Sequence, residues 1–86
     1  MKYKINIKYS AEKSLSKLPN KIHDRIIDKI IELSERPRPR NSKKLESKEY
    51  YRISSGDYRI LYVIKDKIKE IDIVAVDNRK DVYRNI

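Results

Sequence analysis

Three arginines and one tyrosine in the C-terminal half have side chains suited to holding a phosphodiester. Arg52 and Arg59 lie in neighbouring stretches of a predicted β-hairpin, Arg79 follows the next predicted strand, and Tyr83 comes four residues later. A guanidinium forms two parallel hydrogen bonds to phosphate oxygens and can stabilise the charge that grows on them during cleavage. RNA supplies its own nucleophile, because its 2′-hydroxyl can attack the adjacent phosphate once the two are aligned. These residues therefore predict metal-independent RNA cleavage.

The charge of the chain favours a polyanionic partner. The 86 residues include 22 Lys and Arg against 13 Asp and Glu, a formal net charge of +9. Many of the cations gather between residues 36 and 52, where only two acids occur. Such clustering favours nucleic acid or an acidic protein over a charge that serves only solubility. We predict that the RNA backbone is bound by Arg38, Arg40, Lys43, Lys44 and Lys48, the alternative being a solvated loop.

Several kinds of site are not predicted. The chain has no cysteine, so it has no disulfide, no thiolate metal site and no cysteine nucleophile. The single histidine, His23, lies among charged residues and is expected to be a solvated helix residue. Asp77 and Asp81 have no third ligand nearby, so we predict neither a metal nor another cofactor. No stretch approaches the roughly 20 apolar residues of a membrane span, and no signal peptide is evident, so the expected location is the cytoplasm.

The N-terminal half predicts one strand and two helices. Apolar and polar residues alternate from Tyr3 to Tyr9, which is typical of a half-buried strand. Ser10 offers an N-cap for a short helix that ends at Leu18, and Pro19 can begin the next helix. That second helix has one apolar face, which we assign to Ile22, Ile26, Ile27, Ile30, Ile31 and Leu33.

The C-terminal half predicts a basic loop followed by three strands. Residues 37–44 read as an exposed, extended loop, because each proline biases its predecessor toward extended backbone. The strands are expected at about 49–54, 57–64 and 69–76, and the apolar run 74–76 suggests a central strand. Residues 1–86 are thus expected to form a single domain with an α+β fold. In it an N-terminal strand, a helical hairpin and a three-stranded antiparallel meander make one sheet of about four strands, covered on one face by the helices.

The register of the first hairpin decides how the arginines meet. If Ser55 and Gly56 form a two-residue loop, Arg52 faces Arg59 directly, on the face opposite the one that packs under the helices. Like charges directly opposed on a sheet are destabilising. We therefore expect an anion to sit between these two guanidiniums.

These features occur in an order that resembles a known family. The opening strand is followed by the Leu18-Pro19 helix hairpin, the basic loop with its prolines, Lys43-Lys44-Leu45, the run from Gly56 to Arg59, and finally Asp77-Asn78-Arg79 with Val82-Tyr83. In this order and spacing the whole chain resembles the RelE/ParE toxin superfamily, and it is closer to the RelE branch. No single motif is specific, whereas their combination is fairly specific.

The resemblance implies the toxin of a type II toxin–antitoxin system. RelE-like toxins are ribosome-dependent endoribonucleases that cut mRNA in the decoding site and are held inactive by an antitoxin encoded beside them, here expected to be small and acidic where it binds. The resemblance implies catalytic roles for Arg59, Arg79 and Tyr83, with Arg52 where the family often has a basic residue, and contacts of the predicted RNA-binding residues with ribosomal RNA. Tyr50 departs from relatives that carry a lysine for proton transfer, so Lys48, Tyr83 or another residue must serve as the base.

Two other functions stay open. A ParE-like toxin shares the fold but inhibits DNA gyrase by binding, and such chains tend to lack the set formed by Arg59, Arg79 and Tyr83. An inactive relative that only binds RNA is the third possibility, which the departure at Tyr50 keeps open.

Overall fold

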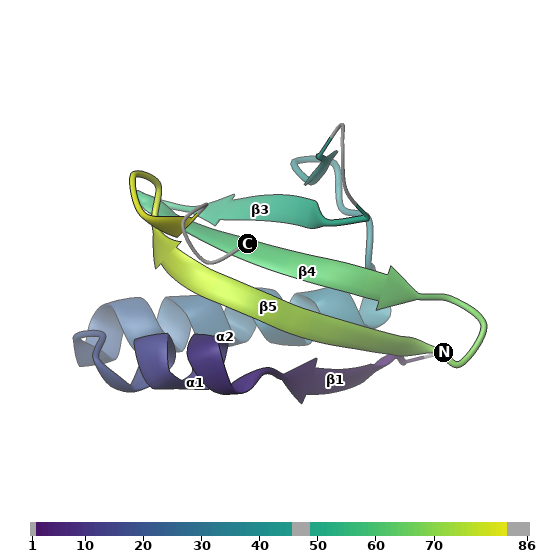
Figure 1. The fold of residues 1–86 in the computed structure, drawn as a ribbon, viewed down its shortest axis with the longest axis horizontal. Helices are drawn as coiled ribbons and strands as arrows, with labels where there is room; N and C mark the ends of the chain where they lie inside the picture. Colours follow the sequence, from purple (N-terminus) through teal and green to yellow (C-terminus); the bar gives the residue numbers. More distant parts are fainter. Residues whose placement is uncertain (1, 46–48, 83–86) are drawn as a thin grey trace.

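In the computed structural model of the chain, two helices cover one face of a five-stranded sheet (Figure 1). The structure describes residues 2–45 and 49–82. The predicted α+β fold is confirmed, with one strand more than the four expected. In chain order the elements are β1 (Lys4–Ile7), α1 (Tyr9–Ser16), α2 (Asn20–Glu35), β2 (Lys43–Lys44), β3 (Tyr51–Ser55), β4 (Tyr58–Lys65) and β5 (Glu70–Asn78).

The strands lie in the order β1-β5-β4-β3-β2. The predicted meander is confirmed, because β3, β4 and β5 pair antiparallel in succession. The first strand pairs parallel with the last, so that Lys4 lies opposite Glu70 and Ile7 opposite Ile73. This places β5 inside the sheet between β1 and β4, as its apolar run predicted.

The main core lies between the helices and the covered face of the sheet. Helix α2 buries Ile26, Ile30 and Leu33, which are spaced four and three residues apart and so share one side of the helix. The prediction for Ile31 is wrong, because its side chain projects away from that side and is 58% exposed. The sheet contributes side chains from three strands, namely Ile53, Ile60, Tyr62, Ile71, Ile73 and Val76.

A β-bulge in β5 explains why the first helix does not begin as predicted. Leu61 pairs with Ala75 while Tyr62 pairs with Ile73, so Val74 has no partner on β4. The hydroxyl of Ser10 donates to the Val74 carbonyl at 3.1 Å. The predicted N-cap is therefore wrong: α1 begins at Tyr9 after Lys8, without a side-chain cap, and Ser10 serves the bulge instead.

The fifth strand comes from the segment that the sequence predicted to be a loop. Lys43 pairs with Arg52 and Lys44 with Tyr51, which makes β2 a two-residue edge strand. The backbone of residues 43–44 is extended and both side chains are exposed, as expected, but these residues belong to the sheet. Short edge strands rich in lysine are a common way to prevent sheets from joining edge to edge.

Candidate nucleic-acid interface

The face of the sheet opposite the helices carries the arginines of the hairpin. The loop consists of Gly56 and Asp57, since Ser55 pairs with Tyr58 and Ser54 with Arg59. The predicted direct opposition of Arg52 and Arg59 is therefore wrong, because Arg52 lies opposite Leu61. The register differs from the predicted one by two residues, so each side chain keeps its predicted face. The two arginines share the open face as diagonal neighbours, and residues in that relation are typically about 7–8 Å apart.

The difference in register arises from the position of the only glycine. Gly56 has a φ of 60°, which suits the first loop position of a type II′ turn. The sequence interpretation placed the glycine second in the loop. With Gly56 first, Asp57 becomes the second loop residue and the strands slide relative to each other.

Arg59 braces this turn from the open face. Its Nη1 donates to the carbonyl of Gly56 at 3.0 Å and to the carbonyl of the preceding residue, Tyr58, at 3.1 Å. Across the sheet Arg59 lies between Ser54 on β3 and Asp77 on β5. Within the described residues, Nη1 alone forms the hydrogen bonds of this guanidinium.

A turn after β5 brings Arg79 to the same hairpin. The backbone N–H of Arg79 donates to the carbonyl of Asp57 at 2.8 Å. Asn78 shapes the turn, because its Oδ1 accepts from the N–H of Lys80 at 3.1 Å and its carbonyl accepts from the N–H of Asp81 at 2.9 Å. The structure thus joins Arg59 and Arg79 to adjacent carbonyls of one turn. Sequence reasoning did not assign this role to Asn78, although asparagine is frequent in such side-chain-supported turns.

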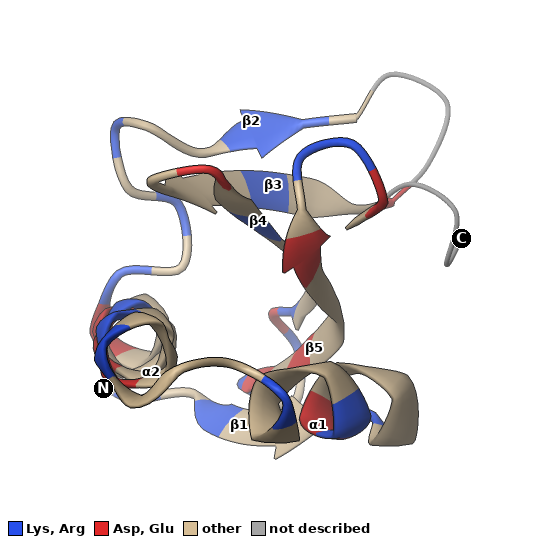
Figure 2. Ribbon diagram, turned by 90° about the vertical axis from the view of Figure 1, so that its left-hand side faces the viewer, with Lys and Arg blue, Asp and Glu red and all other residues tan. Residues whose placement is uncertain are grey.

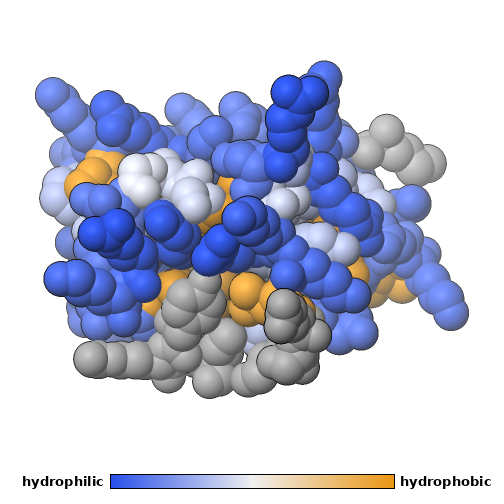
Figure 3. Space-filling view, turned by 90° about the horizontal axis from the view of Figure 1, so that it is seen from above, coloured by the Kyte–Doolittle hydropathy of each residue, from blue (hydrophilic) through white to orange (hydrophobic). Residues whose placement is uncertain are grey.

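Basic residues extend from this point toward the β2 edge. Lys43 lies directly across from Arg52, and Lys44 follows it, with both lysine side chains exposed. Figure 2 shows Lys and Arg along the segment that leads from α2 into β2 and on β3. The side of the molecule seen in Figure 3 is mostly hydrophilic, with hydrophobic residues visible only in small separate areas. Cations thus gather along the β2 edge of the sheet.

A small apolar cluster supports the open face. Leu61, Ala75 and Val82 are buried there, and Leu45 packs against them. The backbone of Leu45 donates to the carbonyl of Tyr50 at 2.9 Å, which closes the loop between β2 and β3. This cluster anchors both the loop and the segment that follows Arg79.

The two loop arginines are placed differently. Arg40 is exposed in the turn before β2. Arg38 forms an ion pair with Asp66, with Nη2 to Oδ2 at 2.8 Å, and its Nε donates to the hydroxyl of Tyr51 at 3.1 Å. The Asp66 carboxylate also accepts from the hydroxyl of Tyr3 at 2.7 Å. Hydrogen bonds from Arg38 and then Tyr3 lower the pKa of Asp66 to about 2, and those to Asp66 and Tyr51 raise the pKa of Arg38.

Arg38 therefore joins the basic loop to the β4–β5 turn through its ion pair with Asp66, a contact called the clasp below. No local pattern pointed to this ion pair, because Asp66 lies 28 residues further along the chain. The same loop is also held from inside the fold, where the buried hydroxyl of Tyr62 donates to the carbonyl of Pro37 at 2.7 Å. Both contacts fix the path of the segment that leads to Lys43.

A buried carboxylate lies at the other end of the open face. Asp72 is 5% exposed and its Oδ2 lies 2.9 Å from Nζ of Lys65 and 3.8 Å from Nζ of Lys8. Its Oδ1 accepts from Nδ2 of Asn6 at 3.0 Å. The Lys65 ammonium, followed by the Asn6 hydrogen bond, lowers the pKa of Asp72 despite its burial. This network ties β1, β5 and β4 together and lies away from the hairpin arginines.

The remaining sequence predictions have simple outcomes. Tyr83 and Lys48 lie outside the described residues, so their roles stay predictions. The imidazole Nδ1 of His23 lies 3.3 Å from Oδ1 of its neighbour Asp24. Within residues 2–45 and 49–82, no three histidine, aspartate or glutamate side chains gather in a way that could hold a metal ion. In the same residues no helix is both long and apolar enough to cross a membrane.

Comparisons with known proteins agree with this architecture. A family model described as the ParE toxin of the type II toxin–antitoxin system parDE matches residues 5–83. Toxin RelG of Mycobacterium tuberculosis is 31% identical over 86 residues, which cover 98% of this chain and 99% of that protein.

Solved structures give the same result. A chain of a RelBE toxin–antitoxin complex from Mycobacterium tuberculosis matches with a TM-score of 0.82 and 29% identity, covering 92% of this chain and 100% of that one. A chain of the archaeal RelE–RelB complex from Pyrococcus horikoshii matches with a TM-score of 0.82 and 32% identity, covering 92% and 97%. The sequence and the fold thus agree that this chain belongs to the RelE/ParE superfamily, as a toxin of a type II toxin–antitoxin system.

Proposed function

We propose that this toxin is a ribosome-dependent endoribonuclease that cleaves mRNA by attack of a 2′-hydroxyl on the adjacent phosphate. The observation that carries the proposal is the convergence of Arg59 and Arg79 on one turn. The side chain of Arg59 is bound to the carbonyl of Gly56 and the backbone N–H of Arg79 to that of Asp57, so two arginine residues from separate parts of the sequence are held at the same end of the hairpin. Arginines held close together can neutralise the charge that grows on a phosphate during cleavage.

The arginines supply charge stabilisation more readily than proton transfer. A guanidinium stays protonated at all ordinary pH values, so Arg59 and Arg79 are suited to neutralise the oxygens of the pentacoordinate phosphate. The proposed role of Tyr83 is to stack on a base, orient the attack or move a proton, although a free tyrosine titrates near pH 10 and is a poor base at neutral pH. We therefore expect slow cleavage of free RNA, with the ribosome supplying alignment of the substrate.

The cations near β2 are proposed to hold the RNA and ribosome backbone. Lys43 and Arg52 are opposed on neighbouring strands, which places two cations side by side at this edge. Lys44, Arg40 and Lys48 extend this surface in our proposal. Arg38 contributes indirectly, because its ion pair with Asp66 fixes the loop.

A cognate antitoxin is the proposed protein partner. The matched structures from Mycobacterium tuberculosis and Pyrococcus horikoshii are RelBE-type complexes, which supports a complex of the same kind here. The net charge of +9 favours an antitoxin that is acidic where it binds. No cofactor is part of the proposal.

Cleavage can be tested by primer extension after expression of the toxin. The template is one message with its start codon intact and the same message with that codon destroyed. Cuts in the translated message alone are expected, and Arg79→Ala should abolish them while leaving the melting temperature close to that of the unmodified protein. Lys17→Ala removes an equal charge from the end of α1 and serves as the control. Equal cutting of both messages would refute dependence on the ribosome.

The basic edge can be tested separately from the chemistry. Lys43→Ala combined with Lys44→Ala should weaken ribosome binding and lower the salt dependence of binding by about one unit of slope for each phosphate that is no longer neutralised. Single-turnover cleavage at saturating ribosomes should be preserved. Unchanged binding at both low and high salt would mean that these lysines are only solvated.

Inhibition of DNA gyrase is the second candidate. The matched family model bears the ParE name, and Tyr50 stands where RelE-like relatives can have a lysine. A supercoiling assay with purified gyrase discriminates between the two functions. Inhibition of supercoiling without any cut in the translated message would replace the endoribonuclease proposal.

A further inference from the structure

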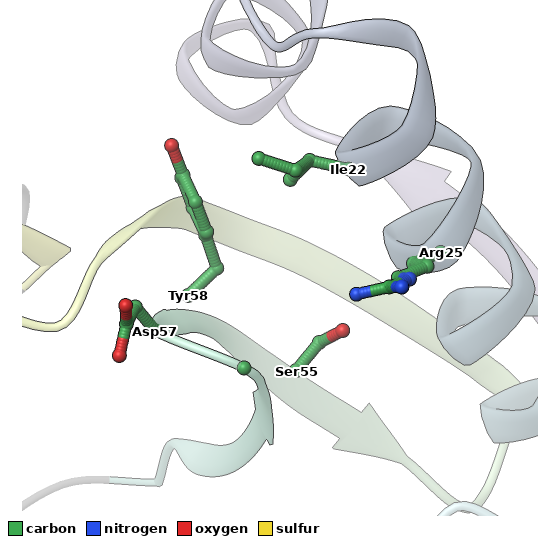
Figure 4. A pocket seen from close by; sticks show the side chains of 6 residues that line it. Ile22, Arg25, Ser55, Asp57 and Tyr58 are labelled. Atoms are coloured by element: carbon green, nitrogen blue, oxygen red, sulfur yellow. The ribbon is translucent and has the colours of Figure 1, made fainter.

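A cavity lies on the helix side of the sheet, behind the turn that holds the arginines. Its volume is about 240 Å³, and it is lined by Ile22, Arg25, Ser55, Gly56, Asp57 and Tyr58. Figure 4 shows Ile22 and Arg25 entering from α2 and the other residues coming from the hairpin. The cavity therefore lies between the first half of α2 and the tip of the β3–β4 hairpin.

The walls of the cavity are of two kinds. Ile22 and Tyr58 are half-buried and continue the main apolar core outward to the surface. The guanidinium of Arg25 and the hydroxyl of Ser55 point toward each other, while the carboxylate of Asp57 points away (Figure 4). An occupant thus meets an apolar wall on one side and a cation with a hydroxyl on the other.

The guanidinium of Arg25 indicates the chemistry of the occupant. Among the described residues, no acceptor lies within hydrogen-bond or ion-pair distance of the Arg25 guanidinium, whereas Arg38 has Asp66. An arginine beside an apolar wall matches a carboxylate attached to, or next to, an apolar side chain. Cavities of about 150 Å³ accept a benzene ring, so this one has room for one apolar side chain of a partner.

We propose that this cavity docks an acidic segment of the antitoxin, with one apolar side chain seated between Ile22 and Tyr58 and one carboxylate on Arg25. The proposal rests on the assignment of an antitoxin partner and does not depend on RNA cleavage. The net charge of +9 attracts an acidic protein in general, and Arg25 offers one carboxylate of that protein a binding position in the cavity. A partner seated here would contact the turn whose carbonyls hold Arg59 and Arg79 from the opposite face.

The test is the affinity of the purified toxin for the antitoxin encoded beside it, measured by calorimetry for matched charge reversals. Arg25→Glu should weaken binding about ten-fold or more, with a smaller loss at high salt, because a repulsive pair replaces an attractive one. Lys21→Glu makes the same change of charge on the same helix, outside the cavity, and should weaken binding less than about three-fold. Equal losses for the two variants would show that only net charge matters and would overturn the proposal.

A second pair of variants separates charge from shape inside the cavity. Ser55→Asp places a carboxylate where we expect the partner's carboxylate, and Ser55→Asn has nearly the same size without the charge. Weaker binding by the aspartate variant alone is expected, with equal melting temperatures for both. Equal affinities for the two variants would overturn the proposal.

Cleavage of a translated message, measured without antitoxin, distinguishes this surface from the RNA site. Arg25→Glu should cleave as the unmodified toxin does, since the cavity lies on the helix side of the sheet. Loss of cleavage with unchanged antitoxin affinity would assign Arg25 to RNA and refute the docking proposal. A toxin that cleaves nothing at all would refute the proposed function and leave the affinity comparison intact.

Discussion

The buried hydroxyl of Tyr62 gives the sharpest test of how the basic loop is held. Tyr62 is fully buried, and its hydroxyl donates to the carbonyl of Pro37 at 2.7 Å. Tyr62→Phe keeps the ring and removes this bond. A net protein hydrogen bond contributes about 0.5–1.5 kcal/mol, and a buried carbonyl left without a donor raises the loss toward about 3 kcal/mol. In a domain of this size each 1 kcal/mol lowers the melting temperature by roughly 4–8 °C.

The pH dependence of the stability difference checks that the Tyr62 hydroxyl is buried. Burial raises the pKa of Tyr62 to about 12, whereas an unfolded tyrosine titrates near pH 10. A raised pKa means that the contribution of Tyr62 to stability is complete below about pH 10 and is lost as the pH rises toward about 12. The phenylalanine variant lacks this group. The stability difference between the two proteins should therefore be constant at neutral pH and shrink above about pH 10.

Denaturant unfolding followed by circular dichroism measures both effects. Tyr51→Phe is the matched control, because within residues 2–45 and 49–82 the Tyr51 hydroxyl accepts only from the exposed Arg38 and should contribute less than about 0.5 kcal/mol. If Tyr62→Phe melts with the unmodified protein, the hydroxyl does not anchor the loop. If the stability difference does not change between pH 9 and pH 11.5, burial does not raise the pKa of Tyr62.

Three further substitutions test the clasp and the two turns. Asp66→Asn removes the ion pair with Arg38. Because the pKa of Asp66 is lowered to about 2 in the folded protein, the urea midpoint of the unmodified protein should fall toward that of the variant as the pH drops from about 4 to 2. Asn78→Ala should lower the free energy of unfolding by about 0.5–1.5 kcal/mol and reduce single-turnover cleavage, because it loosens the turn that carries Arg79. Asn78→Asp keeps the acceptor and should restore both stability and cleavage. Equal cleavage by the two variants would contradict this role. Gly56→Ala should lower stability by about 1–2 kcal/mol in a thermal melt through its φ of 60° alone, because nothing lies within 4 Å of the added methyl group, and Gly56→Asn should lose less.

Side-chain periodicity predicted the faces of the elements correctly. The alternation in β3 and β4 placed Arg52 and Arg59 on the open face, and this survives an error of two residues in register because strands have a period of two. The spacing of the isoleucines similarly predicted the buried side of α2, apart from Ile31. Such patterns are local, and they record which side of each element meets the core.

The contacts that depend on distant residues were not predictable from the sequence. The exact register depends on whether Gly56 comes first or second in a two-residue loop, which composition alone does not decide. The strand at Lys43 exists only because Arg52 lies beside it, and the Arg38–Asp66 ion pair joins two turns. The cavity beside Arg25 depends on how α2 packs over the hairpin.

The parallel pairing of β1 with β5 has a consequence for the order in which the toxin can assemble. A ribosome makes β1 first, and the partner of Lys4 is Glu70, so the first strand waits unpaired while almost the entire sheet is synthesised. Pairings between such distant segments close slowly, since the entropy of a long loop must be lost before any contact forms. Arg79 lies beyond β5 and reaches the hairpin later still. The turn that holds Arg59 and Arg79 is therefore completed only at the end of synthesis, and under the proposed function the ribosome that makes the toxin finishes the chain before the chain can act on it.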